Sequence, residues 1–126
     1  MKRIILDTDF LIHCAENKVD YVEEIRRICN FSYQLFIIDR TIDELDYIIE
    51  NNRGVIVFNA KLAKLIVTKK GIEKIKTEEN KTVDTLILAN VTKDDIVATM
   101  DAGLKRKLKG IPLIVLRKKQ FLVLME

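Results

Sequence analysis

The sequence predicts an α/β fold, a three-layer sandwich in which helices cover both faces of a mainly parallel central sheet. Short, continuous runs of Ile, Leu and Val are typical of strands buried on both faces, and segments with helical spacing separate these runs. The 126 residues fit one domain spanning residues 1–126, and the 48% of hydrophobic residues can form a core. Four glycines and one proline are too few for a linker or a second domain.

The two kinds of element alternate along the chain. We expect strands at residues 3–7, 34–38, 72–76, 95–100, 112–117 and 121–125, the last of which could instead form an apolar interface, and helices within 8–30 and at 41–51, 55–69, 82–91 and 101–110.

The first half is predicted from two unbroken apolar runs and the helical patterns that follow them. "RIILD" and "QLFII" lack the alternation of a half-exposed strand, so both are expected to be buried strands. Val22, Ile25 and Ile28 recur at helical spacing, with acids before them and arginines after them, as the helix dipole favours. "TIDELDYIIEN" shows the same spacing and predicts the next helix.

The second half continues the alternation. In residues 55–69 we expect Leu62, Leu65 and Ile66 to face inward, and Gly71 suits the end of that helix. "IEKIK" alternates like an edge strand, "TVDTLILANV" predicts a helix, and "DIVATM" and "PLIVLR" predict strands around a short helix that ends at Gly110. The phenylalanines are expected in the core, namely Phe10, Phe31, Phe36 and Phe58.

Four acids follow predicted strands or lie at the starts of predicted helices: Asp7, Glu44, Asp84 and Asp101. Each has a local structural alternative, because Asp7 and Asp101 suit helix N-caps, Thr41 and Glu44 could form a capping box, and Asp84 suits a first helical turn. In a parallel sheet, however, ligands bind outside the carboxyl ends of the strands. We therefore expect these acids to converge there, where a divalent cation would offset their repulsion.

The same residues resemble the motifs of the PIN-domain nucleases over about residues 3–117. Asp7 and Thr8 lie in "ILDTDFLI", Glu44 in "TIDEL", Asp84 in "TVDTLIL", and Asp101 follows Thr99 in "IVATMDAGLKRKL". The end of the chain is most similar to the branch related to ribosomal-RNA processing factors, rather than to the VapC-type toxins. Position 9 is often Asn in the family but is Asp here, and Thr85 stands where many members have a further acid or amide.

This resemblance implies a PIN-like fold and a Mg²⁺- or Mn²⁺-dependent endoribonuclease. Asp7, Glu44, Asp84 and Asp101 would hold the metal and carry catalysis, with Thr8, Asp9 and Thr99 in support. The only histidine, His13, is expected to have a packing or surface role.

Charge is distributed unevenly along the chain. Residues 1–50 carry 11 acids and 6 bases, whereas residues 102–126 carry seven bases and one acid. A basic flank beside an acidic site suits RNA held near metal ions, although such a run can also be a solvated face. The residues expected to bind RNA are Lys105, Arg106, Lys107, Lys109, Arg117 and Lys118.

Three alternatives stay open: a catalytically weak RNA-binding assembly factor of the same fold, a toxin-type PIN ribonuclease, and a phosphoacceptor receiver domain using Asp39. A homodimer and an antitoxin are the protein partners considered. Cys14 and Cys29 form no metal-binding pattern, and no apolar run reaches the roughly 18 residues of a membrane span. We therefore expect a cytoplasmic protein without membrane contact.

Overall fold

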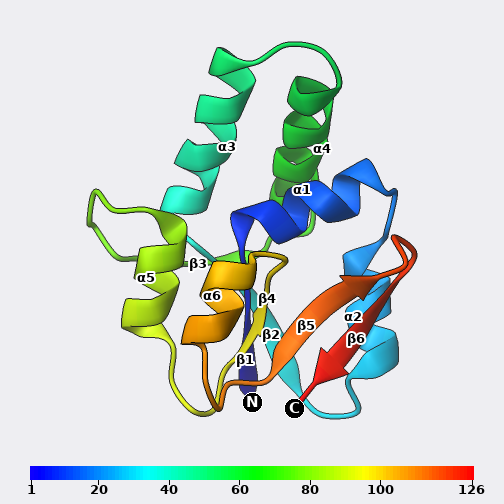
Figure 1. Ribbon diagram of the computed structural model, residues 1–126, viewed down its shortest axis with the longest axis vertical. Coiled ribbons are helices and arrows are strands. Elements are labelled where there is room, and N and C mark those ends of the chain that lie inside the picture. Colours follow the sequence, from blue (N-terminus) through cyan, green and yellow to red (C-terminus); the bar gives the residue numbers. More distant parts are fainter.

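A six-stranded sheet forms the centre of the computed structural model, which describes residues 1–126 (Figure 1). The strands lie in the order β3-β2-β1-β4-β5-β6, and every neighbouring pair is parallel except β5 and β6. The elements are β1 (Lys2–Leu6), α1 (Thr8–Glu16), α2 (Tyr21–Ile28), β2 (Tyr33–Ile38), α3 (Arg40–Asn51), α4 (Val55–Lys69), β3 (Glu73–Ile75), α5 (Val83–Asn90), β4 (Ile96–Ala98), α6 (Ala102–Lys107), β5 (Leu113–Arg117) and β6 (Phe121–Met125).

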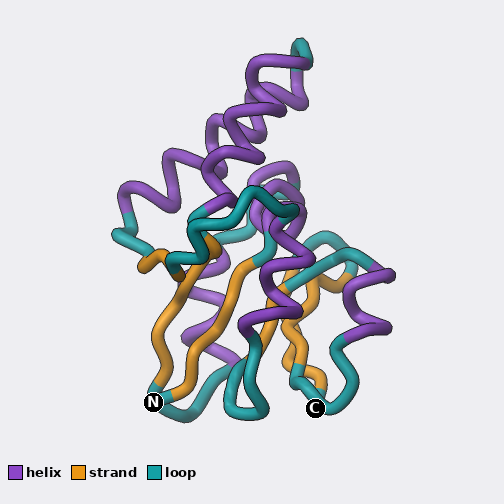
Figure 2. The backbone as a smooth tube through the Cα atoms, turned by 90° about the vertical axis from the view of Figure 1, so that its left-hand side faces the viewer, coloured by secondary structure: helices purple, strands orange, loops and turns teal.

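Helices cover both faces of this sheet, so the predicted three-layer α/β architecture is confirmed (Figure 2). Successive side chains of a strand point to opposite faces. Ile4 and Leu6 of β1 therefore join the larger core beneath α1, α2, α3 and α4, while Ile5 joins the smaller core beneath α5 and α6. The short Ile and Leu runs lack polar alternation because both faces of the sheet are covered.

The structure resolves two points that the sequence left open. The segment from residue 8 to residue 30 forms two helices, α1 and α2, separated by residues 17–20, because Asp20 caps a new helix through the Glu23 amide. "FLVLM" is the strand β6, which pairs with β5 along its whole length.

The helix α4 is turned slightly from the expected orientation: Leu62 and Ile66 are half-buried against the larger core, as expected, but Leu65 is not. The helix packs through Asn59, Ala60, Ala63 and Val67, and this leaves Leu65 51% exposed and Phe58 66% exposed. Among the other phenylalanines expected in the core, Phe10 is fully buried, whereas Phe31 and Phe36 are half-buried. In Figure 1, α3 and α4 extend beyond the sheet, where one side of α4 has no neighbour.

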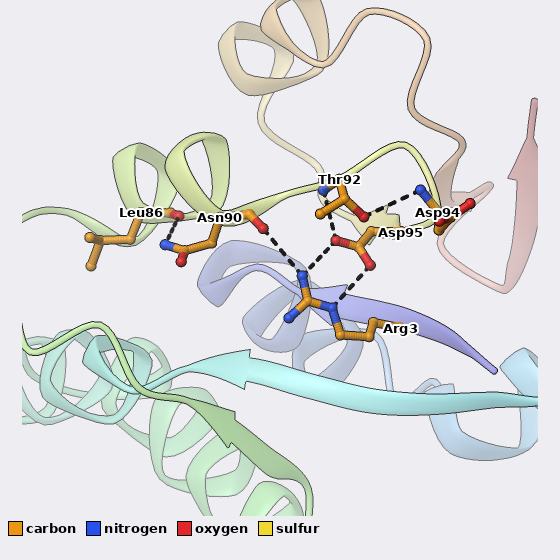
Figure 3. Close-up of polar contacts among 6 residues, drawn as sticks. All are labelled: Arg3, Leu86, Asn90, Thr92, Asp94 and Asp95. Atoms are coloured by element: carbon orange, nitrogen blue, oxygen red, sulfur yellow. Dashed lines mark hydrogen bonds and ion pairs between the residues drawn. The ribbon is translucent and has the colours of Figure 1, made fainter.

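At the amino ends of the strands, Arg3 of β1 is bound to Asp95, the residue before β4 (Figure 3). The guanidinium group donates to both carboxylate oxygens, at 3.0 and 2.7 Å, and to the Asn90 carbonyl at 3.2 Å. The Thr92 amide donates to the same carboxylate at 2.9 Å. These bonds join β1 to the loop between α5 and β4.

No helix of the protein has the length and apolar character required to cross a membrane. Cys14 and Cys29 are buried and unpaired.

Candidate active site

Asp7 lies at the carboxyl end of β1 and is the N-cap of α1, so its predicted capping role and its place at the sheet edge coincide. One carboxylate oxygen accepts a hydrogen bond from the Thr8 amide at 2.9 Å, and the other accepts from the Thr99 hydroxyl at 2.8 Å. Its exposed fraction is only 5%. The carboxylate is therefore fixed in position at both oxygens.

Thr99 connects the two strand-end acids. Its hydroxyl donates to Asp7, and its oxygen accepts a hydrogen bond from the Asp101 amide at 3.1 Å. Thr99 is fully buried immediately after β4. The structure thus gives Thr99 the geometry of a positioning residue for both carboxylates.

A second carboxylate opposes the ionisation of Asp7. Burial, followed by the negative charge of Asp9, raises the pKa of the Asp7 carboxyl to about 8, although bonds from Thr99 and the Thr8 amide act in the opposite direction. Asp9 is half-buried in the first turn of α1 and accepts from the Met100 amide at 3.4 Å. Two carboxyl groups in this arrangement favour either a shared proton or a neighbouring cation.

Glu44 reaches from α3 to the start of α5. Its Oε2 accepts a hydrogen bond from the amide of Val83, the first residue of α5, at 2.9 Å. The capping box with Thr41 does not form, because α3 begins at Arg40 and the buried Thr41 hydroxyl has no partner. Glu44 therefore caps a neighbouring helix rather than its own.

Asp84 and Asp101 are exposed acids at helix starts. Asp84 accepts from the Thr82 hydroxyl and from the Thr85 amide, and Asp101 accepts from the Leu104 amide at 3.0 Å. In each side chain the second carboxylate oxygen has no partner within the protein. Both acids thus fill the structural roles expected of them and keep one oxygen available.

The four predicted acids and Asp9 line one cavity of about 320 Å³ at the carboxyl edge of the sheet, which we call the acidic cavity. Its lining consists of Asp7, Thr8, Asp9, Ile12, Glu44, Ile48, Thr82, Asp84 and Asp101. The predicted convergence from four parts of the chain is present.

Four residues outside the predicted set also contribute to the site: Thr82, Ile12, Ile48 and Gly103. A Cβ atom at Gly103 would lie 3.1 Å from Asp101 Oδ1, so the glycine leaves room for that carboxylate. Thr82 stands two residues before Asp84, and this polar residue at a helix N-cap was the available sequence signal.

The chemistry of the cavity fits a divalent cation. Five carboxylates line it with no Lys, Arg or His among them, and the buried Thr8 hydroxyl has no hydrogen-bond partner. Mg²⁺ and Mn²⁺ prefer such oxygen ligands, and Mg²⁺ usually binds through one or two carboxylates plus water and phosphate oxygens. In the arrangement described, no three His, Cys, Asp or Glu side chains form a group that could hold an ion.

The predicted RNA-binding residues form two groups. Lys105, Arg106 and Lys107 lie in the last turn of α6, with Lys109 beyond it, and α6 runs from the carboxyl edge of the sheet toward its amino edge (Figure 1). Arg117 and Lys118 lie at the carboxyl end of β5. The second group therefore shares the sheet edge of the acidic cavity.

Two further residues have roles apart from the cavity. His13 belongs to α1, and its Nδ1 donates to the Asp9 carbonyl at 2.8 Å. The Asp39 carboxylate accepts from the Thr77 amide and hydroxyl and from the Glu78 amide. These bonds anchor the loop after β3 and account for Asp39 without a phosphoacceptor role.

Comparison with known proteins gives four matches. The family described as "PIN like domain" matches residues 4–119. Ribonuclease VapC4 of Methanocaldococcus jannaschii is 28% identical over 128 residues, covering 96% of this chain and 95% of that protein. The solved structure of the PIN domain endonuclease Utp24 has a TM-score of 0.80 at 23% identity, covering 97% of this chain and 90% of that one.

A domain of a functionally unknown protein from Methanocaldococcus jannaschii has the same fold at a TM-score of 0.62 and 19% identity, covering 93% of this chain and 92% of that one. The two solved structures support the fold, and the family match extends over nearly the whole chain. The resemblance found in the sequence motifs is thus confirmed, and the chain belongs to the PIN-domain nuclease family.

Proposed function

We propose that this protein is a Mg²⁺- or Mn²⁺-dependent endoribonuclease that hydrolyses RNA phosphodiester bonds in the acidic cavity. The observation that carries the proposal is the convergence of five carboxylates, uncompensated by any basic side chain, on one cavity at the carboxyl edge of the sheet. The family membership and the relative named as a ribonuclease support the same conclusion.

Each side chain has a distinct part in this proposal. Asp7, held at both oxygens, would be the most rigid metal ligand, and Thr99 would keep Asp101 in register with it. Glu44 would hold the start of α5, and with it Asp84, against the cavity. Asp84 and Asp101 each keep a carboxylate oxygen that can accept a proton from the attacking water.

A bound divalent cation would lower the pKa of that water and neutralise charge on the phosphate. The protein's own contribution is to hold the ligands and the substrate in place at a partly buried site.

The test is cleavage of single-stranded and structured RNA with Mn²⁺ or Mg²⁺, compared with Asp7→Asn and Asp101→Asn. We expect each substitution to lower the rate by about 100-fold or more, because each removes a preorganised charge from the site. Asp94→Asn is the matched control, since Asp94 is exposed near the opposite edge of the sheet and should leave the rate unchanged. Activity that survives both site substitutions would refute the assignment.

RNA binding without cleavage is the second candidate function. It is favoured by one observation, namely that no three acids form a metal-binding group in the arrangement described. RNA binding that persists without cleavage at any Mn²⁺ or Mg²⁺ concentration would establish this alternative. Ribosomal RNA as substrate, a toxin-type role, an antitoxin and a homodimer remain predictions, and the VapC4 relative makes an antitoxin a specific one to test.

A further inference from the structure

The turn between β5 and β6 places two consecutive lysines in the left-handed backbone region. Lys118 has a φ of 51° and Lys119 a φ of 55°, and the Gln120 amide closes the turn on the Arg117 carbonyl at 3.0 Å. A turn with two such residues matches the twist of a hairpin, but Asn and Gly usually fill it because other residues pay about 1–2 kcal/mol each. The hairpin accounts for the positive φ values at these two positions, but it does not explain why lysine occupies them.

These lysines line a hollow of about 490 Å³, which we call the turn hollow. Its other walls come from the end of α1 and from the residues after β4 and in β5. They are His13, Glu16, Asn17, Met100 and Leu116. Because β5 runs parallel to β4, the turn lies at the same edge of the sheet as Asp7 and Asp101.

The linings of the turn hollow and the acidic cavity are in contact. Asp9 lines the acidic cavity, and it accepts from the amide of Met100, which lines the turn hollow. The Asp9 carbonyl also accepts from His13 Nδ1, and the Met100 sulfur accepts from the Leu116 amide at 3.3 Å. The two hollows therefore follow one another along α1, whose nine residues span about 13 Å.

Charge differs sharply between the two hollows. No lysine or arginine lines the acidic cavity, and Lys118 and Lys119 are the only ones that line the turn hollow. Its single acid is Glu16, which forms no ion pair. A phosphate in the turn hollow would therefore meet two cationic side chains, whereas a phosphate in the acidic cavity would meet none in its lining.

We propose that the turn hollow binds the nucleotide next to the cleavage point of a single RNA strand, with Lys118 and Lys119 on its phosphate. This inference rests on the proposed function and extends it from the chemistry to the path of the substrate. Each hollow has a volume within the roughly 300–1,000 Å³ of small-ligand sites, which suits one nucleotide apiece. His13 and Asn17 supply polar groups beside the apolar surface of Met100.

The test replaces the turn by its strain-free sequence, Lys118→Asn with Lys119→Gly. Binding of a short fluorescent single-stranded RNA is measured by anisotropy across a salt series, on an Asp7→Asn background so that no cleavage is needed. We expect Kd to rise about tenfold and the salt slope to fall by about 0.7, since the contact with one phosphate is lost. The Tm should rise in the same variant because the positive-φ strain is relieved. A purely structural role would move only the Tm.

Two further variants make the result specific. Lys61→Ala with Lys69→Ala removes two exposed charges from α4 and is the matched control. This variant should leave Kd within about twofold of the parent, because salt screens interactions with distant exposed charges. Glu16→Gln removes the only acid of the turn hollow and should tighten binding. If the turn variant binds RNA as the α4 variant does, the subsite is refuted. If the turn variant loses binding and the wild type never cleaves, the subsite stands and the nuclease proposal fails.

Discussion

Asp7 is the residue at which stability and proposed function conflict most directly. Its carboxyl lies almost fully buried beside Asp9, and its pKa is raised to about 8 by burial first and by that charge second. A carboxyl group buried beside a second carboxylate destabilises the folded protein whenever it ionises. Metal binding would remove that cost, because the cation favours the ionised form.

Asp7→Asn should therefore stabilise the metal-free protein. The unfolded chain loses the Asp7 proton near pH 4, whereas the folded protein keeps it to about pH 8, so the free energy of unfolding falls as the pH rises across this window. We expect the variant in EDTA to gain about 3–8 °C in Tm at pH 8 and nothing below about pH 4.

Thermal unfolding across pH, with and without Mn²⁺, measures this effect. Mn²⁺ should raise the Tm of the wild type and leave that of Asp7→Asn nearly unchanged, since ligands stabilise only the state that binds them. Equal Tm values for the two proteins at pH 8 would contradict the assigned environment of Asp7.

At the scale of elements, α4 shows what a sequence pattern leaves undecided. Leu62, Leu65 and Ile66 form one apolar stripe, while Ala60, Ala63 and Val67 form another at similar spacing. The structure buries the second fully and Leu62 and Ile66 of the first only in part, because small side chains let α4 pack against α1 and α3. Periodicity identified the helix correctly, but only the position of its neighbours decides which stripe faces them.

The contact between α3 and α5 could likewise not be predicted from local sequence patterns. Glu44 looked like the end of a capping box within its own helix, yet it caps a helix 39 residues further along the chain. The amide of Val83 is the first of α5 and has no partner within that helix. A side chain from α3 therefore positions the helix that carries Asp84.

Glu44→Ala should loosen the start of α5 specifically. We expect the Val83 amide to exchange with solvent about tenfold faster or more, while amides in the centre of α4 keep their protection. Hydrogen exchange measured residue by residue checks this, with Asp43→Ala as the matched loss of an exposed acid from the same helix. Unchanged exchange at Val83 would show that another group holds α5.

For the whole molecule, the two edges of the sheet have opposite roles. The carboxyl edge gathers uncompensated acids around the acidic cavity, whereas the amino edge pairs its buried acid, Asp95, with Arg3 (Figure 3). Burial raises the pKa of Asp95, but bonds from Arg3 and Thr92 lower it more strongly. The acids of the carboxyl edge destabilise the folded protein, so the rest of the fold must offset this cost. The ion pair at the amino edge contributes part of the stability that does so.

The sequence predicts the acidic cavity more readily than it predicts the ion pair of Arg3 and Asp95. Four acids at strand ends and helix starts share a recurring order, so the motifs and the parallel-sheet rule together predicted their convergence. Arg3 and Asp95 stand 92 residues apart without any local pattern, and only the pairing of β1 with β4 brings them together. Long-range polar contacts of this kind follow from register, which a single sequence leaves open.

Asp95→Asn tests the role of the amino edge. Asp95 is 2% exposed, so the substitution leaves Arg3 without its charged partner and should lower the free energy of unfolding by about 2–4 kcal/mol at pH 7. The lowered pKa of Asp95 means that its contribution is present above about pH 4 and is lost as the pH falls through the folded-state value. Denaturant unfolding should thus show the deficit at pH 7 and a smaller one near pH 3.

Asp94→Asn, the adjacent exposed acid, should stay within about 0.5 kcal/mol of the wild type at both pH values. A deficit that is the same at pH 3 and pH 7 would assign the loss to packing rather than to the ion pair, because a packing contribution does not titrate.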